Sequence, residues 1–209
     1  MKKGFTLIEL ITTLVILSII AFIVTPNILV SIKDYKKQVY DTNLGSIKSA
    51  AMSWAADNVN DTHFPADEET SLLVTIQELI DNADLDSKIT DPINGGTFDD
   101  EDHNTFVILD CINIVDEITG EVKNSKYSYN VYISTDDFIE QAAIRYAEDN
   151  GIKNNLTIKV SELKGKYIKS NIYNTDTYIS KNNTSKIDIS DNTEVTITYN
   201  GKEYKAVVK

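Results

Sequence analysis

The stretch that most constrains this chain is residues 10–32, which are 23 residues without a single charge. As an α-helix such a run extends about 35 Å, which is enough to cross the hydrocarbon core of a bilayer. Glu9 stands at the head of the run, and the next ionisable side chain is Lys33. A carboxylate in an apolar segment is costly in lipid and marks a functional contact by default. The stretch therefore predicts a membrane or fibre-core helix in which Glu9 has a role of its own.

Two simpler interpretations of this segment are an ordinary signal peptide and a plain membrane anchor. A secretory signal has a shorter apolar core followed by a small-residue cleavage site. The sequence AFIVTPN at residues 21–27 offers no such site. A plain anchor accounts for the apolar run but gives Glu9 no function.

Residues 1–9 read MKKGFTLIE, and an apolar helix with Pro26 inside it follows. This pattern closely resembles the class III signal of type IV prepilins and related pseudopilins. The resemblance implies that a membrane peptidase cuts between Gly4 and Phe5 and that Phe5 becomes the N-methylated terminus. It also implies that Glu9 is the acid of the family motif.

Phe5 and Glu9 are four residues apart, so they share one face of a helix. Cleavage creates an ammonium group on Phe5, and Glu9 can pair with that group on a neighbouring subunit. A buried charge without its partner is strongly destabilising, so a subunit out of register is disfavoured. We therefore expect Glu9 to guide assembly rather than to catalyse a reaction.

Hydrophobic periodicity continues past Pro26 and predicts one long helix over residues 6–57, with a kink or a melted turn near Pro26. Residues 74–82 predict a short helix in which Thr75 and Glu78 are spaced as a capping box. Residues 104–115 and 126–134 predict two strands joined as a hairpin.

The second half of the chain repeats motifs of the first. AAMSWAADN at residues 50–58 matches AAIRYAEDN at residues 142–150, and VTIQEL at residues 74–79 matches IKVSEL at residues 158–163. A helix over residues 136–150 and a strand–turn–strand tail around Asn200-Gly201 complete the second unit. A coincidence over nine residues is the alternative to a duplication.

The predicted fold class is α+β, with a long N-terminal helix packed on an antiparallel sheet, as in the pilin fold, and a second helix-plus-sheet unit behind it. This plan resembles a Gram-positive minor pilin with two pilin-like subdomains. The predicted segments are a leader at 1–4, a transmembrane or fibre-core helix at 5–33, and pilin-like headgroups at 34–134 and 135–209.

Composition argues against several other functions. The net charge is −12 and Arg145 is the only arginine, whereas nucleic-acid binding needs clustered Lys and Arg. The chain has two histidines, and neither a Ser-His-Asp arrangement nor a Gly-rich phosphate loop can be argued from the spacing. We therefore do not expect an enzyme or a nucleic-acid binder.

Cys111 is the only cysteine, so no intrachain disulfide can form. Cys111, His63 and His103 offer ligands that zinc takes at a structural site, and one structural zinc is the only cofactor that we predict. The alternatives are a buried thiol on the strand face of Val107 and Leu109, and solvated loop histidines. The acidic run at residues 99–102 is either a solvated turn or a loose calcium site.

The leading functional hypothesis is a minor pilin that assembles into a type IV pilus and displays its headgroups for adhesion or aggregation. The resemblance implies other pilin subunits, prepilin peptidase and an inner-membrane assembly platform as partners, besides a ligand on a host or cell surface. It also implies a single-pass membrane location before assembly and an extracellular pilus afterwards. The alternatives are a pseudopilin of a type II secretion-like or DNA-uptake system and, in another class, a membrane-anchored extracellular enzyme.

Overall fold

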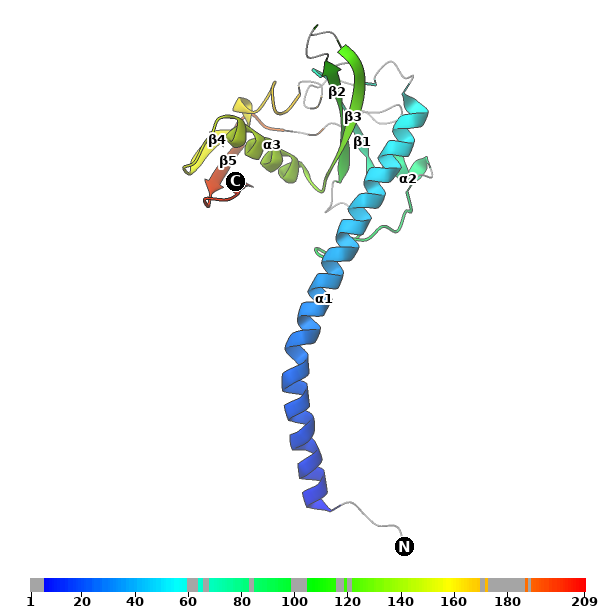
Figure 1. Ribbon diagram of the computed structural model, residues 1–209, viewed down its shortest axis with the longest axis vertical. Coiled ribbons are helices and arrows are strands. Elements are labelled where there is room, and N and C mark those ends of the chain that lie inside the picture. Colours follow the sequence, from blue (N-terminus) through cyan, green and yellow to red (C-terminus); the bar gives the residue numbers. More distant parts are fainter. Residues whose placement is uncertain are drawn as a thin grey trace.

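A long N-terminal helix leads into a head built from two antiparallel sheets and a second long helix (Figure 1). The protein is known from a computed structural model, and this arrangement confirms the predicted α+β class. The described residues are 6–59, 64–65, 68–82, 85–98, 105–115, 119, 122–169, 172, 187 and 189–209, without the side chains of 23–24, 26–27, 114–115 and 122–124. The elements are α1 (Leu7–Asn58), β1 (Ser71–Thr75), α2 (Ile76–Asp81), β2 (Phe106–Val115), β3 (Val122–Tyr132), α3 (Thr135–Asp149), β4 (Leu156–Lys159), η1 (Val160–Glu162), β5 (Glu194–Tyr199) and β6 (Tyr204–Val208).

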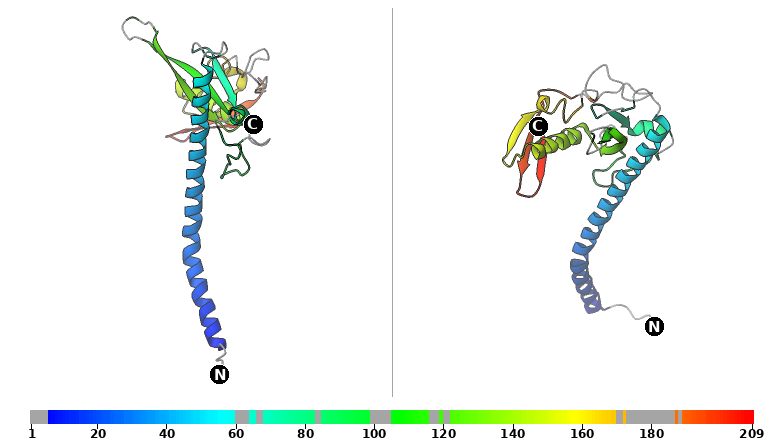
Figure 2. Two further views of the ribbon diagram at one scale, coloured as in Figure 1. Left: turned by 90° about the vertical axis from the view of Figure 1, so that its right-hand side faces the viewer. Right: turned by 45° about the horizontal axis from the view of Figure 1, so that its top comes forward.

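Helix α1 has 52 residues and agrees with the predicted long helix within one residue at each end. The helix continues through Pro26 without a break. Of the two predicted alternatives, a kink or a melted turn, the melted turn is therefore wrong. Figures 1 and 2 show α1 bending in its front half. The rear half reaches the head, where Ile47, Ala51 and Trp54 are buried.

The first sheet has the strand order β1-β2-β3 and is antiparallel throughout. Its register pairs Leu72 with Leu109 and Val107 with Val131. Because side chains alternate between the two faces of a strand, these four residues lie on one face. They belong to the hydrophobic cluster that contains the buried rear of α1.

The opposite face of the first sheet packs against α3. Leu73, Phe106, Ile108 and Tyr132 join the cluster that contains Phe138 of α3 and the buried residues of the second sheet. The second sheet has the order β4-β5-β6, and α3 contacts both β5 and β6. The head is therefore layered as α1, first sheet, α3 and second sheet (Figure 1). This second cluster crosses the predicted boundary between residues 134 and 135, so the two predicted headgroups share buried surface.

The strands β1 and β4 were not predicted from the sequence. The predicted short helix over residues 74–82 is confirmed only from Ile76, because Ser71–Thr75 forms a strand that pairs with β2. Four of the five residues of β1 are buried, so the strand shows no alternation of apolar and polar residues. Thr75 is the N-cap of α2, and its hydroxyl accepts the Glu78 N–H at 3.3 Å, which is one of the two bonds of the predicted capping box.

The structure places the two copies of the sequence repeat in equivalent surroundings. In each copy a strand residue, Val74 or Ile158, is buried just ahead of a short helix. At the end of the preceding long helix, the Asn58 side chain donates to the Trp54 carbonyl at 2.8 Å, and the Asn150 side chain donates to the Tyr146 carbonyl at 2.8 Å. The alanines shared by the two motifs are all buried: Ala50, Ala51, Ala55, Ala142, Ala143 and Ala147.

Candidate functional site

The N-terminus of α1 is closed by a capping box between Thr6 and Glu9. The Thr6 hydroxyl accepts the Glu9 N–H at 3.3 Å. Glu9 Oε2 accepts the Thr6 N–H at 2.9 Å and the Thr6 hydroxyl at 2.8 Å. These bonds satisfy backbone donors that every helix N-terminus leaves without an intrahelical partner. Glu9 therefore holds the start of its own helix with one carboxylate oxygen.

This local role of Glu9 was not among the sequence-based predictions. The spacing of Thr6 and Glu9 is the capping-box signature followed by an apolar run, so the signal was present in the sequence. Glu9 Oε1 has no hydrogen bond within the described part of the chain. One oxygen thus serves the cap, and the other faces outward on an exposed residue.

The front half of α1 carries apolar side chains that the head does not cover. Phe22 is 83% exposed and Leu7 is 77% exposed, and further exposed members are Ile8, Leu14, Leu17 and Leu29. Exposed apolar surface of this extent marks a contact with another molecule or with lipid. Searched over the described residues, no helix combines the length and apolarity that a membrane span requires.

The predicted processing residues Gly4 and Phe5 lie outside the described residues, and so does the predicted leader at 1–4. Their roles in cleavage and methylation therefore remain predictions. The described chain begins at Thr6, next to the predicted terminus of the mature protein, so the Thr6–Glu9 cap lies directly beside the predicted cleavage site.

Of the three predicted zinc ligands, only Cys111 is described. It is a free cysteine, 4% exposed, and its thiol donates to Asn113 Oδ1 at 3.7 Å. It lies two residues beyond Leu109 on the same strand face, as the buried-thiol alternative expects. His63, His103 and the acidic run at 99–102 lie outside the described residues. Within the described part, no group of three or more His, Cys, Asp or Glu residues could hold a metal ion, and the zinc site remains a prediction.

Comparison with known proteins places the recognisable part of the chain at its N-terminus. Residues 1–25 match the family model of the prokaryotic N-terminal methylation motif. Searches of curated proteins and of solved structures found no match to the chain. Residues 1–25 thus carry the class III prepilin signal of type IV pilins, which marks a structural subunit of the pilin-like or pseudopilin type.

Proposed function

We propose that this protein is a minor subunit of a type IV pilus, assembled through α1 and displaying its head on the fibre surface. The observation that carries the proposal is the division of α1 into two halves. The rear half buries one face, from Ile47 to Ala55, in the head, whereas the front half exposes its apolar side chains and includes most of the methylation motif. Such a helix needs lipid before assembly and other apolar helices after it.

Glu9 has the position that register control requires. Its Oε2 is occupied by Thr6 within the same chain, and its Oε1, which has no hydrogen bond to any described residue, is open to a donor from a neighbouring subunit. Cleavage after Gly4 would place the Phe5 ammonium of a neighbouring subunit among the available donors. A neighbour whose ammonium reaches this oxygen is stabilised, and a neighbour out of register loses the pair.

The head supports a display role. Beyond the first sheet, which packs on α1, it contains α3 and the second sheet (Figure 2), and this bulk is better suited to surface contact than to a thin piston. We propose adhesion or aggregation as the use of this surface. The partners proposed are other pilin subunits, prepilin peptidase, an assembly platform in the membrane and a ligand on a host or cell surface.

The proposed path begins with a single pass through the cell membrane and ends in an extracellular fibre. The uncharged run at residues 10–32 supports the first stage. Gold-labelled antibody against the head tests the second stage. We expect labels along fibres sheared from the cells, and a protein confined to the membrane fraction would contradict the proposal.

A pseudopilin of a secretion-like or DNA-uptake machine is the second candidate, because the same motif serves both classes. It predicts a short periplasmic or cell-wall structure and no labelled extracellular fibre. A structural zinc at Cys111 is a separate proposal. It would stabilise a head that has no disulfide, and it is tested below.

A further inference from the structure

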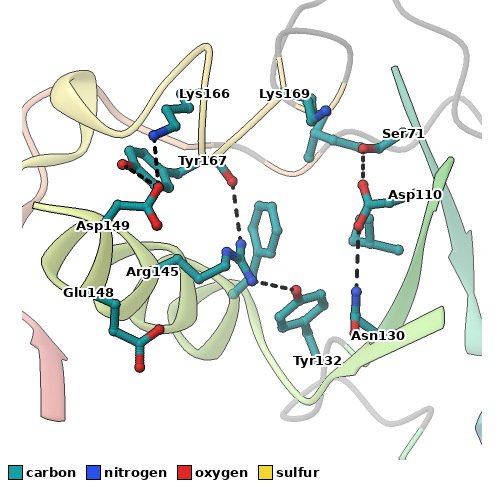
Figure 3. A pocket seen from close by; sticks show the side chains of 13 residues that line it. Ser71, Asp110, Asn130, Tyr132, Arg145, Glu148, Asp149, Lys166, Tyr167 and Lys169 are labelled. Carbon is teal, nitrogen blue, oxygen red and sulfur yellow. Dashed lines mark hydrogen bonds and ion pairs between the residues drawn. The ribbon is translucent and has the colours of Figure 1, made fainter. Parts of the chain in front are cut away.

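A cleft of about 340 Å³ opens between the first sheet and α3, and residues just beyond η1 close it from above (Figure 3). This volume lies within the range of small-ligand sites in proteins. None of the residues that line the cleft comes from α1, and the cleft combines side chains from both predicted headgroups. Its charged lining residues are of both signs: Asp110 on the sheet side, Arg145, Glu148 and Asp149 on α3, and Lys166 and Lys169 beyond η1.

Arg145 is the cation of the α3 side, where the nearby acid Asp149 is already paired with Lys166 at 2.7 Å. Its guanidinium donates to the Tyr132 hydroxyl at 3.3 Å and to the Tyr167 carbonyl at 3.4 Å. Both acceptors are neutral, and no carboxylate of the described residues forms an ion pair with Arg145. A guanidinium has five N–H donors, so donors remain for a ligand. Figure 3 shows the group pointing between α3 and the sheet.

Asp110 of β2 is the acid of the sheet side. It accepts a hydrogen bond from the Ser71 hydroxyl and another from the Asn130 amide, the latter at 3.5 Å. Neither donor is charged, and a carboxylate offers about four acceptor positions, so acceptor positions remain for a ligand. Figure 3 shows the three side chains in a row opposite Arg145. Lys169 lies at the rim of the same cleft.

Aromatic rings lie between the two sides. Tyr132 and Phe138 are buried and meet edge to face, with ring centroids 4.9 Å apart at 75°. Burial raises the pKa of the Tyr132 hydroxyl, against the opposing effect of Arg145. The hydroxyl therefore stays protonated at neutral pH, and its oxygen remains a fixed acceptor for Arg145. The rings are held by packing and supply apolar surface for C–H groups.

We propose that this cleft binds a uronic acid unit, that is, a hexose with a carboxylate, from an acidic polysaccharide. The planar fork of Arg145 matches a carboxylate with two hydrogen bonds. Asp110 and Asn130 take the sugar hydroxyls, and the edges of the buried aromatic rings that line the cleft offer a small apolar contact to C–H groups. A phosphorylated ligand fits less well, because its larger negative charge would approach Asp110. The inference deepens the proposed surface display and rests on it for where the sugar is met.

The test measures binding of D-glucuronate to the full mature chain in a detergent without a sugar headgroup, by titration calorimetry or saturation-transfer NMR. We expect a Kd on the order of 1 mM for this small ligand. D-glucose, which lacks the carboxylate, should bind at least about tenfold more weakly. Arg145→Gln should weaken glucuronate binding by about tenfold or more, and Arg145→Lys should be intermediate because it keeps the charge without the fork.

Lys202→Gln is the matched control, because it removes the same charge at the turn between β5 and β6, outside the cleft. Its glucuronate affinity should equal that of the unaltered chain. Equal binding of glucose and glucuronate would overturn the proposal without any variant, and so would tighter binding of alanine, a zwitterion that could bridge Arg145 and Asp110. Lack of glucuronate binding by a chain that is found in fibres would overturn the cleft proposal and leave the pilin proposal standing.

Discussion

The two halves of the head should unfold together, and Ile197→Ala tests this most sharply. Ile197 lies in β5 and is fully buried in the cluster that contains Phe106 and Tyr132 of the first sheet. Truncation of a buried Ile to Ala costs about 2–5 kcal/mol. If the shared cluster couples the halves, the first sheet loses the same stability, although Ile197 belongs to the second.

Trp54 makes this coupling measurable. It is the only tryptophan, and it is buried in the other cluster, between α1 and the first sheet. In a fragment covering residues 34–209, its fluorescence reports unfolding of the first half alone. A loss of about 3 kcal/mol should lower the melting temperature seen by Trp54 by roughly 6–12 °C for a chain of this size.

Val207→Ala is the control, because Val207 is an aliphatic residue of the same sheet that is 57% exposed. Its effect should stay within about 0.5 kcal/mol. An unchanged Trp54 transition in Ile197→Ala, with a second transition appearing at lower temperature in circular dichroism, would refute the coupling. That result would support the boundary predicted between residues 134 and 135.

Three further predictions concern processing, assembly and metal. Gly4→Ser should leave residues 1–4 on the chain, and mass spectrometry of the unaltered mature protein should show N-methylated Phe5 at its start; any other start contradicts the cleavage site. Glu9→Gln keeps an oxygen for the cap but removes the charge, so its incorporation into fibres should fall by about tenfold or more. Thr6→Ala should assemble nearly normally. An equal loss of incorporation in both variants would show that the cap, and not the charge, is responsible. Cys111→Ser and chelation should each lower the melting temperature without adding to one another if zinc is bound, and elemental analysis without stoichiometric zinc would leave a buried thiol.

The elements predicted well from the sequence are those with local signals. Helix α3 begins after Ser134, whose hydroxyl accepts the Asp137 N–H at 3.1 Å. It ends at Asn150 and Gly151, where the glycine has a φ of +61° and thereby adopts a conformation that other residues avoid. Caps of this kind depend on neighbours a few residues away, so a single sequence reveals them.

The layer order of the head has no such local signal. The first sheet is covered by α1 on one face and α3 on the other, so β1 reads as a short apolar run without alternation. A run of this kind cannot be assigned to strand or helix from periodicity alone. Which helix covers which face depends on contacts between residues far apart in the chain.

The two candidate sites likewise differ in whether a local sequence motif reveals them. Glu9 could be found because its motif is continuous, and its cap with Thr6 could have been read from the same four residues. The cleft could not, because Arg145 and Asp110 come from different elements and no spacing rule joins them. In the sequence, Arg145 stands out only as the sole arginine of the chain, and nothing near Asp110 marks it as part of a binding site.

The central claim is that the exposed front of α1 is an assembly surface in which Glu9 pairs with a neighbour. The most direct measurement is the amount of this protein in sheared extracellular fibres relative to the membrane fraction, for the unaltered chain and for Glu9→Val. We expect the unaltered chain in the fibres and the variant retained in the membrane, where loss of a charge favours the apolar environment. Equal incorporation of the two chains would show that the carboxylate does not direct assembly. Absence of both chains from the fibres would contradict the proposal that this protein is a pilus subunit.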